Sequence, residues 1–413
     1  MTATPPTHPP SAHPLREVRA LGMATAAADD VAVSRIVAFL DGLVDRGELN
    51  RILDPVRPRL RGLDTVRRLR FSRLLFLPLD GAIVLPADWT RGEGRMPRNV
   101  LRLLADTVQR AMGAAGDATA MATQAFTTHS TDEITRLGAA VWPAAAALLP
   151  EQAPPGWADC GISARDYPGI AGVCRAVWAV GPVVWAAVAD AEHGPPEPLV
   201  QAALEAILPA GPEALAAVLA TLLLRAAAPG RVAQMATALH PQMQKIALQA
   251  LDAVMAEPPP PFDKLNPQRA AEAAVALADR LEDLARCPLV TGVRQRRLLA
   301  CRQLAEAAFR ASYMVTLQQH MLLPVERLRG AEVVQDAEVT AMETAARQLR
   351  AMELAGRRLG GALHYEQNTQ SLAVRMATIA AGESRPGGLR PVDMARCIEI
   401  LAGSDAATAV LKQ

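Results

Sequence analysis

The sequence predicts an all-α protein built as a multi-layer helical bundle. Alanine is its commonest residue, and alanine, leucine and arginine lose little or no side-chain freedom on entering a helix. Aromatic residues make up only 3% of the 413 residues, whereas apolar residues make up 51%, enough for a sizeable core. The net charge of +1 argues against a disordered polyelectrolyte and against a protein that binds nucleic acid through bulk charge.

Four proline- or glycine-rich segments divide the chain, because proline lacks an amide donor and disfavours helix in the residue before it. Residues 1–14 contain no apolar run, so we expect a disordered tail there and no signal peptide. The predicted parts are this tail, an N-terminal helical domain with a basic helix over 15–150, an alanine-rich region of helical hairpins over 157–257, a long-helix domain over 262–382, and a terminal helix and tail over 391–413.

The N-terminal domain begins with a helix over 31–44, where apolar residues recur at helical spacing behind a pair of aspartates. The basic helix is expected at about 57–70. Over 74–86 two apolar runs flank a Pro-Leu-Asp-Gly sequence, which leaves open a hairpin or a short extended segment, with Pro78 and Pro86 confining it to an edge. Ser130 and Glu133 then match a capping box for the helix that follows.

All five tryptophans lie between residues 89 and 185, which predicts that the bulkiest core is in the first half of the chain. Trp178 and Trp185 would share one helical face if Pro182 merely kinks the helix. The apolar stretch 176–189 that contains both is too short to cross about 30 Å of hydrocarbon, so we expect buried core and no membrane insertion.

The alanine-rich region resolves at its prolines into four helical segments over 198–256. A shift of 32 residues superposes the first pair of segments on the second, for example Ile207 on Leu239 and Pro209 on Pro241. One interpretation of this similarity is a pair of HEAT-like helical hairpins. Two copies are too few for a stacked-hairpin solenoid, which needs at least three units to bury its faces, so the region must pack on its neighbours.

The long-helix domain contains a helical pattern over 332–359. Its apolar stripe runs through Val334, Ala337, Ala341, Ala345, Leu349 and Met352. Acid-base pairs such as Glu353 with Arg357 lie four residues apart on its charged side. Such a helix is either the outer helix of a bundle or a seam through which the chain forms a homo-oligomer.

The five cysteines are far apart and odd in number, which predicts reduced thiols in a cytoplasmic protein. No metal site is expected, because structural zinc uses cysteine pairs two to four residues apart. Gly-Lys-Ser/Thr, Gly-x-Ser-x-Gly and His-Glu-x-x-His patterns are all missing from the sequence, so we expect no cofactor and consider an enzyme the less favoured class. The weak alternative is a prenyltransferase-like magnesium diphosphate site, with Asp279 and Asp283 on one helical turn and Asp336 on a later helix.

Arginine dominates the basic residues, and only three of the 43 are lysine, which is typical of a GC-rich bacterial genome. Two arginine clusters contain few acidic residues. We therefore predict a non-enzymatic protein–protein interaction or assembly subunit that binds a protein partner through helix faces. Nucleic acid or another phosphate ligand is the less favoured partner, because only Phe71 and Phe76 lie near enough to stack on bases. The candidate contact residues are Arg57, Arg61, Arg67, Arg68, Arg70 and Arg73 in the first cluster and Arg294, Arg296 and Arg297 in the second.

Overall fold

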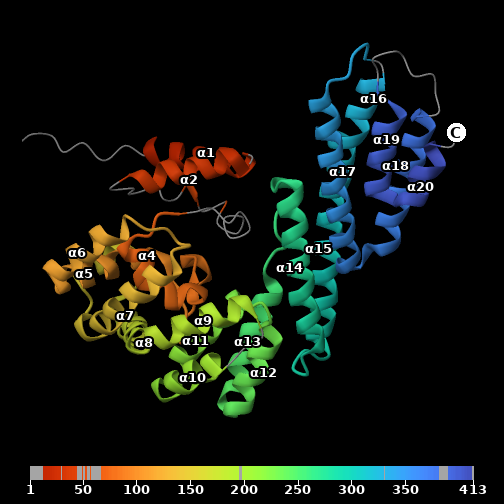
Figure 1. Cartoon of the computed structure of the whole chain (residues 1–413). Helices are drawn as coiled ribbons and strands as arrows, with labels where there is room; N and C mark the ends of the chain where they lie inside the picture. The colour runs from red at the N-terminus through yellow and green to blue at the C-terminus, as the bar shows by residue number, and fades with distance from the viewer. Residues whose placement is uncertain are drawn as a thin grey trace, which may run out of the picture. The chain divides into compact units, whose positions relative to one another are not determined.

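The computed structural model describes residues 13–28, 30–43, 49, 52–53, 56, 67–194, 198–329, 331–380 and 389–411. Within these residues the fold is all-α, as predicted, with short 3-10 turns and a single two-stranded sheet (Figure 1). The chain forms two compact units, residues 1–68 and residues 69–413. Among the described helices none is by itself long and apolar enough to span a membrane, and one sharply bent pair, Ala164–Ala179 with Gly181–Glu192, meets that test jointly.

The first unit contains α1 (His13–Ala27) and α2 (Asp30–Gly42), which contact each other. The helix predicted over 31–44 is confirmed by α2, whose residues Val33, Val37 and Leu40 are buried on one face. Residues 1–12 and 57–66, which include most of the predicted tail and basic helix, lie outside the described residues. The described end of that basic segment, 67–70, is not helical.

The second unit begins with α4 (Phe71–Phe76), which runs into a 3-10 helix over Leu77–Ala82. Only Ile83–Val84 (β1) is extended in the 74–86 region, and it pairs in parallel with Met96–Pro97 (β2). The sequence had left open a hairpin or a short extended segment, and the extended segment is what forms. Gly81 allows this 3-10 helix to pack closely on α11 (Pro212–Arg225), because a Cβ there would lie 2.5 Å from the backbone of Ala220.

The helices that follow pack around α4 and the 3-10 helix after it. The capping box predicted at Ser130 is wrong: Ser130 is the N-terminal cap residue, but its hydroxyl accepts a hydrogen bond from the Thr127 amide at 3.1 Å and makes no bond to the first turn. The helices of this block are α5 (Leu101–Met112), α6 (Ala114–Thr123), α7 (Thr131–Leu148), α8 (Tyr167–Ala179) and α9 (Gly181–His193), with 3-10 turns at Pro86–Asp88, Arg98–Val100, Trp157–Cys160 and Ala164–Asp166.

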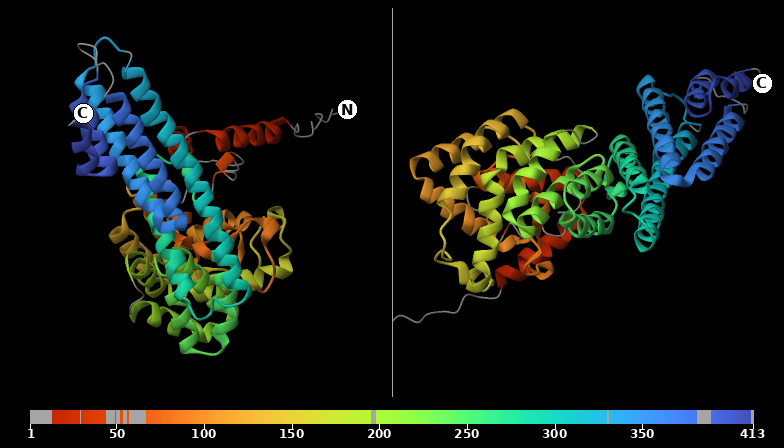
Figure 2. Two further views of the ribbon diagram at one scale, coloured as in Figure 1. Left: turned by 90° about the vertical axis from the view of Figure 1, so that its right-hand side faces the viewer. Right: turned by 90° about the horizontal axis from the view of Figure 1, so that it is seen from below.

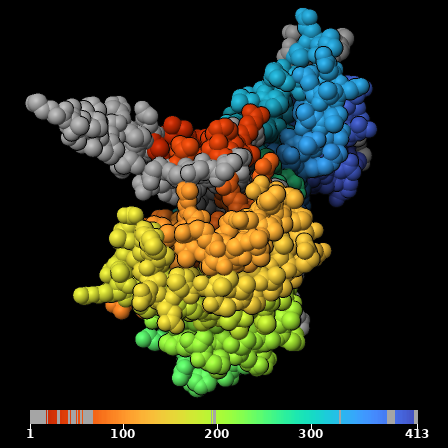
Figure 3. All heavy atoms as spheres, turned by 90° about the vertical axis from the view of Figure 1, so that its left-hand side faces the viewer, coloured from red at the N-terminus to blue at the C-terminus, as the bar shows by residue number. Residues whose placement is uncertain are grey.

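Tryptophan side chains form the centre of this block. Trp142 and Trp178 are fully buried, and their indole nitrogens donate to the carbonyls of Leu74 and Leu75 at 2.9 and 2.8 Å. Trp178 and Trp185 do not share one kinked helix, because a new helix, with Pro182 in its first turn, begins at Gly181 and is bent by 73° from α8. On the face shown in Figure 3, the atoms of this block, coloured orange to yellow-green, form a continuous surface.

Three consecutive helical hairpins follow and stack on one another. The first two lie over the region of the 32-residue similarity, and their helices begin at or next to prolines as expected. The third hairpin, which the sequence comparison missed, extends both layers, since α12 contacts α10 and α14 while α13 contacts α11 and α15. Their remaining bounds are α10 (Pro198–Ile207), α12 (Pro229–Leu239), α13 (Gln242–Ala256), α14 (Pro267–Arg286) and α15 (Val293–Leu317), with 3-10 turns at Leu208–Ala210 and Phe262–Lys264.

The C-terminal helices pack against α14 and α15. Figure 2 shows α14, α15 and α17 (Asp336–Gly356) lying alongside one another, and α17 contacts both of the others. The other elements are a π-helical segment (Gln318–Leu322), α16 (Leu323–Arg329), a π-helical turn (Arg357–Gly361), α18 (Ala362–Ala380), α19 (Pro391–Ala402) and α20 (Ser404–Leu411).

The stripe expected on 332–359 is confirmed only in its second half. Ala345, Leu349 and Met352 are buried, and α17 packs against α14 and α19 of the same chain. Ala337 and Ala341, which belonged to the predicted stripe, are exposed, and the buried face runs instead through residues such as Met342. The part of the proposed homo-oligomer seam with the largest apolar residues is therefore covered by the protein's own helices.

The five cysteines are unpaired thiols, as the sequence predicted. Cys174, Cys287 and Cys397 are buried, while Cys160 and Cys301 are half-buried. Burial raises the pKa of the Cys397 thiol to about 12, and it also raises the pKa of Cys174. Buried neutral thiols act as small apolar groups in a core.

Candidate functional site

The first arginine cluster is only partly described. Arg57 and Arg61 lie outside the described residues, Arg68 is exposed, and Arg67, Arg70 and Arg73 are half-buried. The two aromatic residues that could have stacked on bases in this region, Phe71 and Phe76, are 5% and 4% exposed and belong to the core. This burial removes the stacking surface that a single-stranded nucleic acid would need here.

The second arginine cluster splits into two roles. The guanidinium of Arg294 binds Asp252 of α13 at 2.7 Å, and Arg297 reaches the other carboxylate oxygen of Asp252 at 3.3 Å. These two ion pairs fasten the start of α15 to α13. Arg296 is exposed and makes no ion pair with another residue that the structure describes. It is therefore the member of the cluster best placed to meet a partner.

Arg302, further along α15, contacts the turn that separates α17 from α18. Its Nε and Nη2 donate to the carbonyls of Leu359 and Arg358, both at 2.8 Å. Carbonyls at the end of a helix have no partner within the helix, so a guanidinium that reaches two of them stabilises the turn. The chain reverses beside them at Gly360, where φ is 126°, in the region that favours glycine.

The two aspartates of the magnesium alternative are engaged in other contacts. Asp279 forms an ion pair with Arg358, and Asp283 accepts a hydrogen bond from the Gly230 amide at the start of α12. Burial raises the pKa of Asp283 above its ordinary value, although the hydrogen bond from Gly230 acts in the opposite direction. Asp283 thus satisfies an otherwise unpaired helix amide.

The third carboxylate of that alternative lies far away. Asp336 is in the first turn of α17, whereas Arg358, the partner of Asp279, follows the last turn of the same helix. Those 21 residues span about 30 Å at 1.5 Å per residue. The structure does not bring the three aspartates together, and nowhere in its described parts do three His, Cys, Asp or Glu side chains group as a metal would need.

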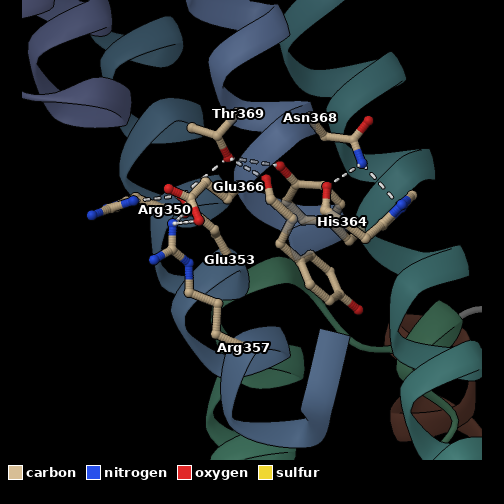
Figure 4. Close-up of polar contacts among 9 residues, drawn as sticks. Arg350, Glu353, Arg357, His364, Glu366, Asn368 and Thr369 are labelled. Atoms are coloured by element: carbon tan, nitrogen blue, oxygen red, sulfur yellow. Dashed lines mark hydrogen bonds and ion pairs between the residues drawn. The ribbon is translucent and has the colours of Figure 1, made fainter. Parts of the chain in front are cut away.

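A buried carboxylate lies at the centre of the C-terminal helices (Figure 4). The side chain of Glu353 is fully buried and accepts a hydrogen bond from Arg350 at 2.6 Å, another from Arg357, and one from the hydroxyl of Thr369 at 3.0 Å. The sequence predicted the Glu353–Arg357 pair but placed it on a solvated face. Because α18 folds back over α17 after Gly360, that face is covered instead.

Aromatic residues continue this cluster towards α15. The hydroxyl of Tyr313 lies 3.2 Å from that of Thr369, and its ring meets Tyr365 edge to face at 5.1 Å. Burial raises the pKa of both tyrosines, and the nearby Glu306 carboxylate raises that of Tyr365 further. The Tyr365 ring lies against Gly356, where a Cβ would come within 2.4 Å of it. With Glu353 and both rings closed to solvent, these residues fix the α17–α18 reversal.

The surface that sequence reasoning missed is one side of α15. We call it the α15 face: it contains four large apolar side chains, Val293, Leu304, Met314 and Val315, which are 55%, 59%, 40% and 52% exposed. Three exposed alanines lie between them. The signal was present in the sequence, because the face repeats every seven residues through Val293, Ala300, Ala307 and Met314. The full set is Val293, Ala300, Leu304, Ala307, Ala311, Met314 and Val315.

The neighbouring helix α14 shows that this exposure is not general. Its exposed residues are polar or charged apart from two alanines, and its apolar residues Leu281 and Leu284 are buried.

In comparisons with known proteins, no protein-family profile, no curated protein and no solved structure matches this chain.

Proposed function

We propose that this chain is a protein–protein interaction or assembly subunit that binds its partner through a helix face. The observation that carries the proposal is the α15 face, with four large apolar side chains exposed along one side of a 25-residue helix. Contiguous apolar surface is unfavourable in water, and where it occurs it commonly marks a site of association. The stacked hairpins that precede α15 support the same proposal, because such stacks present extended surfaces to partners.

The arginines form the polar part of the proposed surface. Arg296 lies beside the apolar residues of the α15 face, so a partner with acidic groups at that end would be favoured. Arg57, Arg61, Arg67, Arg68, Arg70 and Arg73 form a second candidate contact surface. In this proposal the protein is cytoplasmic, and its five free thiols fit a reducing compartment.

The enzyme alternative has less support. Its carboxylates are occupied by Arg358 and by the Gly230 amide, and Asp336 lies about a helix length away. The nucleic-acid alternative is weakened by the burial of Phe71 and Phe76.

The experiment compares the full chain with Leu304→Glu and with a matched control, Leu363→Glu. Both leucines are exposed on helices, at 59% and 68%, but Leu363 is on α18. We expect proteins that co-purify with the wild-type chain to be lost from Leu304→Glu and kept by Leu363→Glu, with circular dichroism unchanged for both. Retention of every partner by Leu304→Glu would refute the role of the α15 face.

A parallel experiment addresses the arginines. Arg296→Glu should weaken the same association, and the effect should shrink as salt is raised, because exposed charges are screened. Charge reversal at Arg57, Arg61 and Arg68 tests the second surface. If partner retention is unchanged in that triple variant, the first arginine cluster is not a contact surface.

A further inference from the structure

We infer that the partner on the α15 face is a second copy of this chain, packed antiparallel to the first through the same face. This inference rests on the proposed function and names the partner that occupies the α15 face. It follows from the arrangement of large and small side chains along the helix, from the distribution of charge at its two ends, and from the area that the face offers.

The α15 face is continuous along the whole helix. Residues seven apart drift by only about 20° around a straight helix, so Val293, Ala300, Ala307 and Met314 lie in one row. Leu304 and Ala311, four residues after members of that row, lie immediately beside it. All six side chains are exposed. A partner helix can therefore contact this row over the length of α15.

The row is complementary to itself when it is reversed. If a two-fold axis passes between Leu304 and Ala307, the Leu304 side chain of each copy faces Ala307 of the other, and Ala300 faces Ala311. Large side chains then meet small ones, and two alanines allow the helix backbones to approach closely. Such self-complementarity is what a two-fold symmetric dimer interface requires, because both copies use the same patch.

Charge selects the antiparallel orientation. In a parallel pair, Arg296 and Arg297 would lie beside the same arginines of the other copy, and like charges would repel. In the antiparallel register, Arg296 instead lies level with Val315 of the other copy. Asp263 is close to that end, because the carbonyl of the preceding Phe262 accepts a hydrogen bond from Ser312 at 2.9 Å. The Asp263 carboxylate pairs with Lys264 at 3.4 Å, but it is 62% exposed and can also meet an incoming arginine.

The area of the face indicates a weak dimer. A helix of 25 residues is about 37 Å long and about 10 Å wide, so it offers roughly 400 Å² per copy. Stable interfaces bury about 800 Å² per partner, and smaller ones belong to transient complexes. We therefore expect association that depends on protein concentration, with half-dissociation in the micromolar range.

Sedimentation velocity over a concentration series of the full chain tests the dimer. The wild-type chain and the Leu363→Glu control should shift from the monomer towards the dimer mass as concentration rises from about 1 to about 200 µM. Leu304→Glu should remain monomeric, because the variant places a carboxylate of each copy beside the two-fold axis, against Ala307 of the other copy. A wild-type chain that stays monomeric throughout, or a Leu304→Glu chain that dimerises like the wild type, would overturn the inference.

Cross-linking tests the orientation. In a Cys160→Ser, Cys301→Ser background, the double variant Ala300→Cys/Ala311→Cys should give a covalent dimer with a short bis-maleimide reagent, because those positions face each other between copies. Each single variant should give little dimer. Efficient dimer formation by Ala300→Cys alone would show a parallel pair and refute the antiparallel arrangement.

The outcomes also separate this inference from the proposed function. A chain that stays monomeric but loses other co-purifying proteins in Leu304→Glu keeps its interaction role, and only the second copy is refuted. If Leu304→Glu changes neither the mass nor the retained proteins, both fail.

Discussion

Replacing Glu353 with glutamine should destabilise the second unit by about 2–3 kcal/mol. The variant keeps the shape of the side chain but removes the negative charge that Arg350 and Arg357 bind. Removing one partner of a buried ion pair costs about 3–5 kcal/mol when the other partner is left without solvent. Here the two arginine side chains are 38% and 33% exposed, so water can partly replace the lost carboxylate and the cost is lower. Thr369 also loses its hydrogen bond to a charged acceptor.

The assay is thermal unfolding followed by circular dichroism. For a unit of this size, 1 kcal/mol shifts Tm by about 2 °C, so Glu353→Gln should lower Tm by about 4–6 °C. The matched control is Glu366→Gln, the same change at a carboxylate that is 47% exposed and lies 3.9 Å from Arg357. It should shift Tm by less than about 1 °C. If the two variants have the same Tm, Glu353 is not held as a buried charged acceptor and the reasoning is refuted.

Three further predictions concern single residues. Arg302→Lys should lower stability by about 1–2 kcal/mol and speed hydrogen exchange in Arg357–Gly361, because an ammonium cannot reproduce the two-carbonyl contact; unchanged exchange there would contradict the assigned role. Iodoacetamide at about pH 8, followed by mass spectrometry of the native chain, should modify half-buried Cys160 first and leave Cys174 and Cys397 unmodified, because burial raises the pKa of both buried thiols; equal labelling of Cys160 and Cys174 would argue against the core packing. The raised pKa of Asp283 means that its protonated form is favoured in the folded state, so its contribution to stability is present below the ordinary value of 3.8 and is lost as pH rises through the folded pKa. The Tm of the wild type relative to Asp283→Asn should therefore fall as pH rises above about 4, and a rise would show that the pKa is lowered instead.

The sequence predicted the helical class and where the helices of the alanine-rich region begin, because prolines act locally. Pro198, Pro212, Pro229 and Pro267 each occupy the first turn of a helix, where a missing amide costs little. The third hairpin could not be found in the same way. The proline-rich connection between α13 and α14 lengthens the repeat and hides α14 and α15 from a comparison at a fixed shift.

The candidate site was predictable only in part, because burial depends on contacts between distant segments. Glu353 and Arg357 have the spacing of an ordinary surface pair, and nothing near them in the sequence indicates that α18 packs over them. Asp283 similarly fits a cation-binding pattern, yet a glycine amide 53 residues earlier in the chain uses its carboxylate. The apolar repeat of α15 was visible, but only the structure shows that no described helix covers it.

The stacking of the three hairpins has a consequence for how local damage spreads. The middle hairpin has neighbours on both sides within the stack, because α12 contacts α10 and α14 while α13 contacts α11 and α15. Within the stack, a defect in one hairpin should reach the next hairpin through the helix faces that the two share. The hairpins have no single common core through which it would reach all of them at once. Local unfolding should then proceed one hairpin at a time, and amide hydrogen exchange should be slowest in the middle hairpin.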